Sequence, residues 1–180
     1  MRKSELSRPS LNLTYELLID LMTVDTHPLI VKRISWPNET ATQAFAQALA
    51  QRAAIGNALL ELRGDLGAGK TTFVRHLLAS LGVQGRIKSP TYAVVEPYTL
   101  PSGLNIWHFD FYRFNDPREW EEAGFRDIFA TEGLKLVEWP EKAGEYLPNA
   151  DLVIAIELQE DESRAVTLTA HTDAGATLAA

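Results

Sequence analysis

The feature that most constrains the fold of this chain is one Gly-rich segment, Gly64-Asp-Leu-Gly-Ala-Gly-Lys-Thr71. It matches the pattern G-x-x-x-x-G-K-[ST], in which a Gly-rich turn joins a β-strand to an α-helix. Glycine allows successive backbone N–H groups to turn inward without Cβ clashes. Together with the N-terminus of the next helix, those N–H groups bind phosphate oxygens. The segment therefore predicts a phosphate-binding loop (P-loop).

The sequence on either side of this loop supports that prediction over a chance Gly-rich turn. An apolar strand is expected over 58–63, immediately before the loop. A helix is expected over 70–81, because apolar residues recur on one side and Gly82 follows as a stop signal. A P-loop requires this strand–loop–helix order.

The loop also predicts the cofactors. The Lys70 ammonium can reach the β- and γ-phosphates, and the Thr71 hydroxyl is suited to Mg²⁺. No Asn-Lys-x-Asp sequence for recognising guanine is present in the chain, which favours ATP over GTP. We therefore expect ATP and Mg²⁺ to bind here.

Two acidic residues are candidates for holding the metal from neighbouring strands. Glu138 ends the apolar segment 134–138, and Asp110 ends the apolar segment 105–110. Mg²⁺ prefers one or two carboxylates, water and phosphate oxygens. We assign Glu138 to Mg²⁺, directly or through water, and Asp110 to a supporting position or to orienting the attacking water. The alternative for each residue is a solvated acid at a strand end.

Other polar and aromatic residues have less specific interpretations. His108 is interpreted as a packed structural histidine in preference to a catalytic base. Thr91 follows a proline, and either senses the γ-phosphate from a mobile loop or serves only as a turn residue. Trp107, Trp120 and Trp139 are expected in the core or on a partner surface.

The order of expected elements predicts the fold class. Strands are expected over 29–34, 58–63, 92–98, 104–114, 134–138, 152–158 and 165–169. About four helices are expected, and the strand–helix–strand order around the Gly-rich loop implies parallel strands. Strands joined by short turns imply antiparallel pairs. The prediction is a three-layer α/β P-loop NTPase with a mixed sheet of about seven strands.

Three regions follow from this pattern. Residues 1–28 form a poorly determined N-terminal extension, and Met22 is an alternative start. Residues 29–170 form the nucleotide-binding domain. Residues 171–180 are small and polar and are expected to be a flexible tail.

Composition excludes several classes of protein. The chain has 180 residues, which suits one domain, and has no cysteine, which excludes disulfides and thiolate metal sites. Its net charge of −7, with scattered basic residues, favours contact with nucleic acid through a partner protein. No stretch approaches the roughly 18 to 20 apolar residues that span a membrane. We expect a cytoplasmic protein without membrane contact.

Four blocks of sequence together resemble the TsaE (YjeE) ATPase family. They are the Gly-rich loop, Ser89-Pro-Thr91, His108-Phe-Asp-Phe-Tyr-Arg113 and Glu138-Trp-Pro-Glu141, in that family's order. The resemblance covers about residues 29–170. Tyr92 stands where the family often has phenylalanine.

The resemblance implies a function. Proteins of that family are bacterial ATPases that associate with TsaB and TsaD to form threonylcarbamoyladenosine (t6A) beside the anticodon of tRNAs reading codons that start with A. TsaD performs the transfer, ATP hydrolysis supports turnover of the complex, and tRNA is contacted through the complex. A P-loop small-molecule kinase and a nucleotide-dependent scaffold are the alternatives. A kinase would need a basic lid, and the chain has no run of arginines suited to one.

The resemblance also implies roles for residues of this chain. Thr71 and Glu138 would hold Mg²⁺, and Lys70 and Asp110 would support hydrolysis. Thr40 and Arg164 would border the nucleotide. The residues implied in phosphate binding are Gly67, Ala68, Gly69, Lys70, Thr71 and Thr72.

Overall fold

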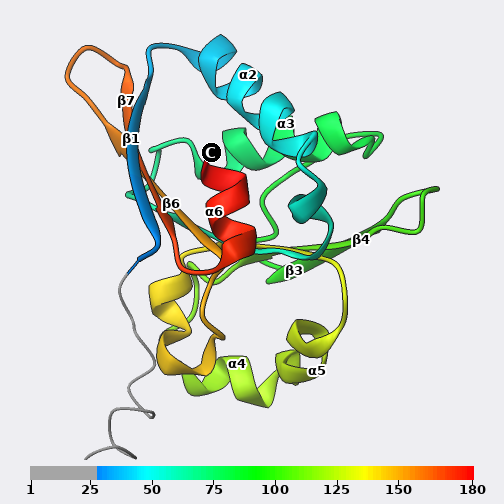
Figure 1. Ribbon diagram of the computed structural model, residues 1–180. Helices are drawn as coiled ribbons and strands as arrows, with labels where there is room; N and C mark the ends of the chain where they lie inside the picture. Colours follow the sequence, from blue (N-terminus) through cyan, green and yellow to red (C-terminus); the bar gives the residue numbers. More distant parts are fainter. Residues whose placement is uncertain (1–27) are drawn as a thin grey trace, which may run out of the picture.

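A computed structural model describes residues 28–180, and residues 1–27, including the alternative start at Met22, lie outside that description. The described part forms an α/β fold around a seven-stranded mixed sheet with the strand order β1-β7-β6-β2-β5-β4-β3, as predicted (Figure 1). The strands are β1 (Ile30–Trp36), β2 (Leu59–Arg63), β3 (Val95–Thr99), β4 (Asn105–Asp110), β5 (Leu134–Glu138), β6 (Leu152–Leu158) and β7 (Arg164–Ala170).

The helices are short and connect the strands. The α-helices are α2 (Glu39–Ala50), α3 (Lys70–Leu81), α4 (Arg118–Glu122), α5 (Phe125–Ala130) and α6 (Asp173–Ala179). The 3₁₀ turns are η1 (Ala53–Asn57), η2 (Pro140–Lys142) and η3 (Gly144–Tyr146). Within residues 28–180, no helix combines the length and the apolar character needed to cross a membrane.

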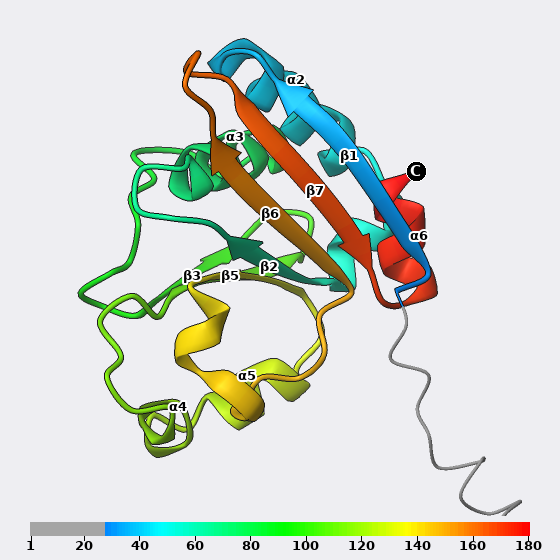
Figure 2. The ribbon, with the colours of Figure 1, turned by 90° about the vertical axis from the view of Figure 1, so that its left-hand side faces the viewer.

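The middle of the sheet is parallel and its two sides are antiparallel. Strand β2 pairs in parallel with both β5 and β6, and β4 pairs in parallel with β5. Strand β3 is antiparallel to β4, and β7 is antiparallel to β6 and β1. Helices α2, α3 and α6 cover one face, and α4 and α5 cover the other (Figures 1 and 2). Strand β5 is buried along its whole length, as expected when both faces are covered.

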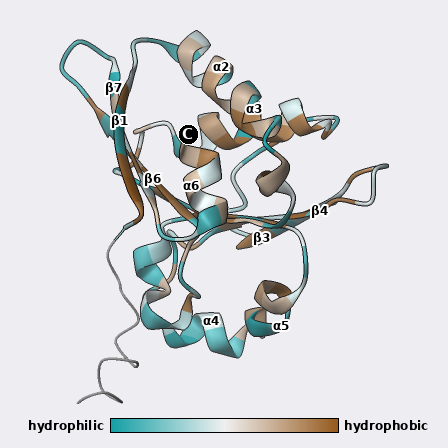
Figure 3. Ribbon diagram, viewed as in Figure 1, coloured by the Kyte–Doolittle hydropathy of each residue, from teal (hydrophilic) through white to brown (hydrophobic). Residues whose placement is uncertain are grey.

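Alternate residues of the parallel strands serve different helices. Leu134 and Leu136 of β5 join the core beneath α3, whereas Val137 joins the aromatic core on the α4 and α5 side. Helix α3 turns an apolar side to the sheet, visible as brown segments among polar ones (Figure 3). Both cores pack against the strands that end at the Gly-rich loop, so the loop has a rigid base.

Two helix boundaries agree with the sequence prediction. Helix α3 runs from Lys70 to Leu81, and Gly82 follows it with φ 104°. Its N–H donates to the carbonyl of Ala79, which completes the last turn. Helix α2 begins after Asn38, whose Oδ1 accepts a hydrogen bond from the Ala41 N–H at 3.0 Å.

The prediction of a flexible tail over 171–180 is wrong, because this segment contains α6. Thr172 caps the helix by accepting a hydrogen bond from the Gly175 N–H at 3.1 Å, and Leu178 is buried. A Cβ at Gly175 would lie 1.8 Å from the Asp151 carbonyl oxygen. The small residues that suggested disorder instead allow the helix to pack closely against the start of β6.

Two strands are shorter than predicted. The strand expected over 92–98 begins only at Val95, because Val94 has φ 69° and its N–H donates to the Pro90 carbonyl oxygen at 2.5 Å. The strand expected over 104–114 ends at Asp110. There the Asp110 carboxylate accepts the Tyr112 N–H at 3.0 Å and turns the chain away.

Candidate active site

The Gly-rich loop joins β2 to α3 in a conformation that requires glycine. Gly64, Gly67 and Gly69 have φ values of 136°, 84° and 113°. A Cβ at Gly64 would also lie 2.2 Å from the Ile156 carbonyl oxygen. The first N–H groups of a helix have no partner within the helix, so this turn presents donors at the positive end of α3. The arrangement is suited to an anion.

The Lys70 side chain is held inside the loop. Its Nζ donates to the carbonyl oxygens of Gly64 at 2.5 Å and Asp65 at 2.9 Å. The same ammonium lies 3.9 Å from the ring centroid of Trp139. Burial lowers the pKa of Lys70, and nearby carboxylates, Glu138 foremost, act in the opposite direction. A cation is thus placed where a triphosphate would follow the loop.

Thr71 and Glu138 form a direct contact at the start of α3. The Thr71 Oγ1 lies 3.0 Å and 2.9 Å from the two carboxylate oxygens of Glu138, and donates to them. Glu138 is 2% exposed, and its Oε1 also lies 2.9 Å from His108 Nε2. Because the Thr71 hydrogen points to the carboxylate, the hydroxyl lone pairs remain free to meet a cation.

Asp110 lies beside Glu138, because the two residues are paired in the parallel register of β4 and β5. Its Oδ2 accepts hydrogen bonds from the hydroxyls of Ser89 and Thr91, the latter at 2.7 Å. Its Oδ1 accepts the Tyr112 N–H. The carboxylate therefore ties the loop that carries Ser89 and Thr91 to the end of the central strands.

The donor set fits Mg²⁺ bound together with phosphate. In the part of the chain that the structure describes, no group of three or more His, Cys, Asp or Glu side chains could hold a metal ion. Thr71 and Glu138 nevertheless offer oxygen ligands, which hard cations prefer. Mg²⁺ typically keeps few protein ligands and completes its shell with water and phosphate oxygens. The site would therefore bind the ion with a nucleotide.

A small cavity continues from the loop along α2. Its volume is about 150 Å³. It is lined by Trp36, Glu39, Thr42, Ala68, Gly69, Thr72 and Arg164. The Arg164 Nε lies 3.4 Å from the Ala68 carbonyl oxygen, which fixes the guanidinium near the loop.

Thr40 does not line this cavity. It is exposed on the first turn of α2, whereas Thr42 is 4% exposed and faces inward. The sequence held a signal for this difference, because Thr42, Ala46 and Leu49 follow the i, i+4, i+7 spacing of the buried side of α2. Thr42, Trp36 and Glu39 are thus site residues that the sequence analysis missed.

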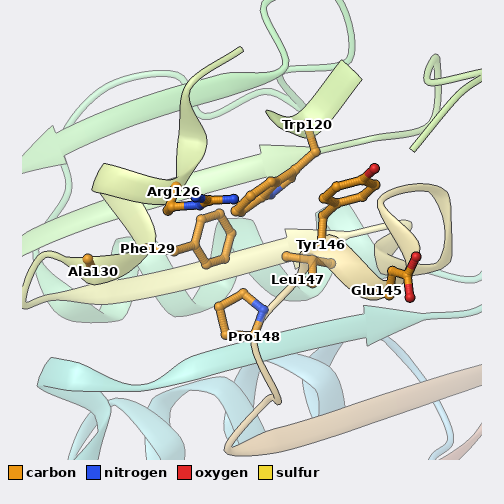
Figure 4. Close-up of a pocket in the computed structure, with 8 residues that line it drawn as sticks. All are labelled: Trp120, Arg126, Phe129, Ala130, Glu145, Tyr146, Leu147 and Pro148. Carbon is orange, nitrogen blue, oxygen red and sulfur yellow. The ribbon is translucent and has the colours of Figure 1, made fainter. Parts of the chain in front are cut away.

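A larger cavity lies on the other face of the sheet (Figure 4). Its volume is about 460 Å³, and Trp120, Phe129 and Tyr146 gather around it, with Arg126 beside Phe129. Its other lining residues are Ala130, Glu145, Leu147 and Pro148. No residue of the four sequence blocks lines it, so size does not make it the candidate active site.

The structure brings most of the predicted site residues together. These are Gly67, Ala68, Gly69, Lys70, Thr71, Thr72, Asp110, Glu138 and Arg164. Trp120 is buried in the aromatic core, as expected, whereas Trp139 covers Lys70. Which ligands these residues bind stays a prediction from the geometry.

Comparison with known proteins follows the same residues. The family model "Threonylcarbamoyl adenosine biosynthesis protein TsaE" matches residues 36–166. A Haemophilus influenzae protein named tRNA threonylcarbamoyladenosine biosynthesis protein TsaE is 47% identical over 117 residues, which cover 65% of this chain and 73% of that protein. A Bacillus subtilis protein of the same name is 37% identical over 142 residues, covering 78% and 87%.

A solved structure also resembles this fold. The crystal structure of Bacillus subtilis YdiB aligns with a TM-score of 0.66 and 31% sequence identity. The alignment covers 83% of this chain and 93% of that one. The similarity therefore includes both the sheet and the segments that build the site.

Proposed function

The chain belongs to the TsaE family of threonylcarbamoyladenosine biosynthesis proteins, and from this premise we propose that it binds and hydrolyses ATP with Mg²⁺ to support t6A formation on tRNA. One observation carries the proposal. Lys70, Thr71 and Glu138 meet at the N-terminus of α3, behind a loop with three glycines at positive φ. This is the arrangement that nucleoside triphosphate chemistry requires.

Binding would use groups that the loop already presents. The N–H groups from Gly67 to Thr72 would hold phosphate oxygens, and the Lys70 ammonium would exchange its carbonyl partners for them. Thr71 and Glu138 would hold Mg²⁺, the first through its free lone pairs. Bound Mg²⁺ supplies a Lewis acid that neutralises charge on the transferring phosphoryl group.

Asp110 would orient the attacking water. Its carboxylate lies next to Glu138 in the sheet and is 3% exposed, so it has a fixed direction. A fixed carboxylate can accept a hydrogen bond from water and hold it in line for attack. Because Ser89 and Thr91 share Oδ2 of this carboxylate, a change at Asp110 would also move their loop.

The loop carrying Ser89 and Thr91 would report nucleotide state to partner proteins. Nucleotide switches commonly order or release one loop through γ-phosphate and metal contacts. We assign TsaD and TsaB as the partners, with tRNA contacted through them in the cytoplasm. The net charge of −7 supports contact through a partner in preference to direct binding of nucleic acid.

The cavity beside α2 would receive the nucleoside part of ATP. Glu39 and Thr42 supply acceptor and hydroxyl groups there, and Arg164 supplies donors near the loop. The chain has no Asn-Lys-x-Asp sequence for guanine, which supports ATP as the nucleotide.

The test is a reconstituted modification assay. TsaD, TsaB, this chain and tRNA lacking t6A are combined with the transfer substrate, with ATP or with a non-hydrolysable analogue. Sustained t6A formation is expected with ATP and the native chain, and a single round or less with Lys70→Ala. Equal multiple-turnover yields for the native chain and Lys70→Ala would contradict the proposal.

A further inference from the structure

His108 is a buried polar side chain that the proposed function leaves without a task. It lies on β4, two residues before Asp110 and on the same face, and it is 0% exposed. Its Nε2 lies 2.9 Å from Glu138 Oε1. Its Nδ1 has no hydrogen-bond partner among the described residues. A histidine buried only for packing has no need to point at a carboxylate of the candidate metal site.

The contact determines which ring nitrogen carries hydrogen. An ionised carboxylate only accepts hydrogen bonds, so Nε2 must be the donor to Glu138. An unpartnered N–H at Nδ1 would be a buried donor without an acceptor, which is costly. The arrangement is therefore the neutral ring with hydrogen on Nε2 and a bare lone pair on Nδ1.

Glu138 is held from two directions. His108 faces Leu136 in the register of β4 and β5, and Glu138 is two residues further along β5 on the same face. Thr71 approaches from α3 and lies 2.9 Å from Oε2. Without the His108 donor, the carboxylate would keep one side-chain donor and could rotate away from Thr71.

We propose that His108 is a positioning residue whose Nε2–H orients Glu138 against Thr71, and that it thereby sets the Mg²⁺ affinity of the nucleotide complex. The inference rests on the proposed function, because it needs a nucleotide and a metal at this site. Groups that hold a metal-binding carboxylate in place typically contribute about 10- to 100-fold to metal affinity when they are removed.

The test compares His108→Met, which removes the donor and keeps a long apolar side chain, with His108→Gln, which returns an N–H donor. The Kd of ADP is measured with and without Mg²⁺ by calorimetry, and the ratio of the two values is the readout. Ile106→Val is the matched control, because Ile106 is buried on the same face of β4.

We expect His108→Met to reduce the Mg²⁺ ratio about tenfold or more and to leave the Kd without Mg²⁺ unchanged. His108→Gln should restore most of the ratio, and Ile106→Val should match the native chain. A native ratio in His108→Met would overturn the inference. Equal losses in the Met and Gln variants would also overturn it, because they would indicate a requirement for shape only.

A second measurement needs no variant that removes the donor. Nitrogen-15 NMR of the native chain should show hydrogen on Nε2 of His108 and none on Nδ1, with His108→Gln used for assignment. Hydrogen on Nδ1 alone would overturn the inference even if His108→Met did not fold. A native chain that binds no ADP would overturn the proposed function as well, whereas the other contrary outcomes leave it standing.

Discussion

The two faces of the central sheet use the same strands for different purposes. On the face beneath α3, β4 and β5 present His108, Asp110 and Glu138, all buried and all joined to hydrogen-bond partners. On the opposite face, alternate residues of the same strands contribute Phe109 and Val137 to an aromatic core. Burying unpaired polar groups is unfavourable, so the first face is organised for binding and the second for stability.

This difference makes the two faces separable by mutation. Substitutions on the aromatic face should change stability and leave nucleotide chemistry intact. Substitutions beneath α3 should do the reverse, because their partners form a local network. The predictions below begin with the largest expected effect.

Phe125→Ala should lower the free energy of unfolding by about 3 to 5 kcal/mol, since it opens a cavity in the aromatic core. The Phe125 ring lies 5.2 Å from that of Phe109 and 6.5 Å from that of Trp120. Urea denaturation gives the stability, and ADP affinity at low temperature gives the state of the site. A large loss of ADP affinity in folded protein would show that the two faces are coupled. Trp120→Phe serves as the mild variant and should leave hydrolysis nearly intact.

Lys70→Ala should reduce ATP hydrolysis by about 10²- to 10³-fold, the usual result of removing a preorganised group that stabilises charge in the transition state. The midpoint of thermal unfolding should change little, because only the two carbonyl contacts of Lys70 are lost. Initial rates of ADP release measure the first quantity. Arg52→Ala removes an exposed cation after α2 and is the charge control. Similar rates for Lys70→Ala and Arg52→Ala would refute the assignment.

Asp110→Asn should lower the hydrolysis rate by about 10- to 100-fold while ATP affinity stays within a few fold, because the residue would act on water and not on the phosphates. Single-turnover rates and equilibrium binding separate the two effects. If Mg²⁺ dependence falls with Asp110→Asn and is unchanged in Glu138→Ala, the metal would have to be reassigned to Asp110.

Thr42→Val should weaken ATP binding by roughly 2- to 12-fold, the value of one hydrogen bond, and Thr40→Val should have no effect. Both changes remove a hydroxyl from α2, but only Thr42 lines the cavity. Calorimetric titration with ATP distinguishes them. The opposite ranking would mean that α2 is rotated when nucleotide binds.

Much of the fold could be predicted because local signals and tertiary structure agree. Helix α3 has a glycine at each end and an apolar side, so both its bounds were predictable. Helix α6 was missed because its stability comes from packing against β7 and Asp151, and small residues alone do not indicate such a partner. Likewise, nothing local to 92–94 indicated the positive φ of Val94.

The site divides in the same way. The residues of the loop were found because their chemistry is contiguous in sequence. The contact between His108 and Glu138 depends on the register of β4 against β5, which the sequence does not specify. The position of Trp139 over Lys70 depends on its φ of 58°, an unusual conformation for a non-glycine residue that follows a strand.

The most direct test of the central claim is a crystal structure with Mg²⁺ and a non-hydrolysable ATP analogue. We expect the phosphates to lie on the N–H groups of Gly67 to Thr72, with Lys70 at the terminal phosphates and Mg²⁺ next to Thr71 and Glu138. A nucleotide bound elsewhere, for example in the cavity around Trp120 and Phe129, would contradict the account.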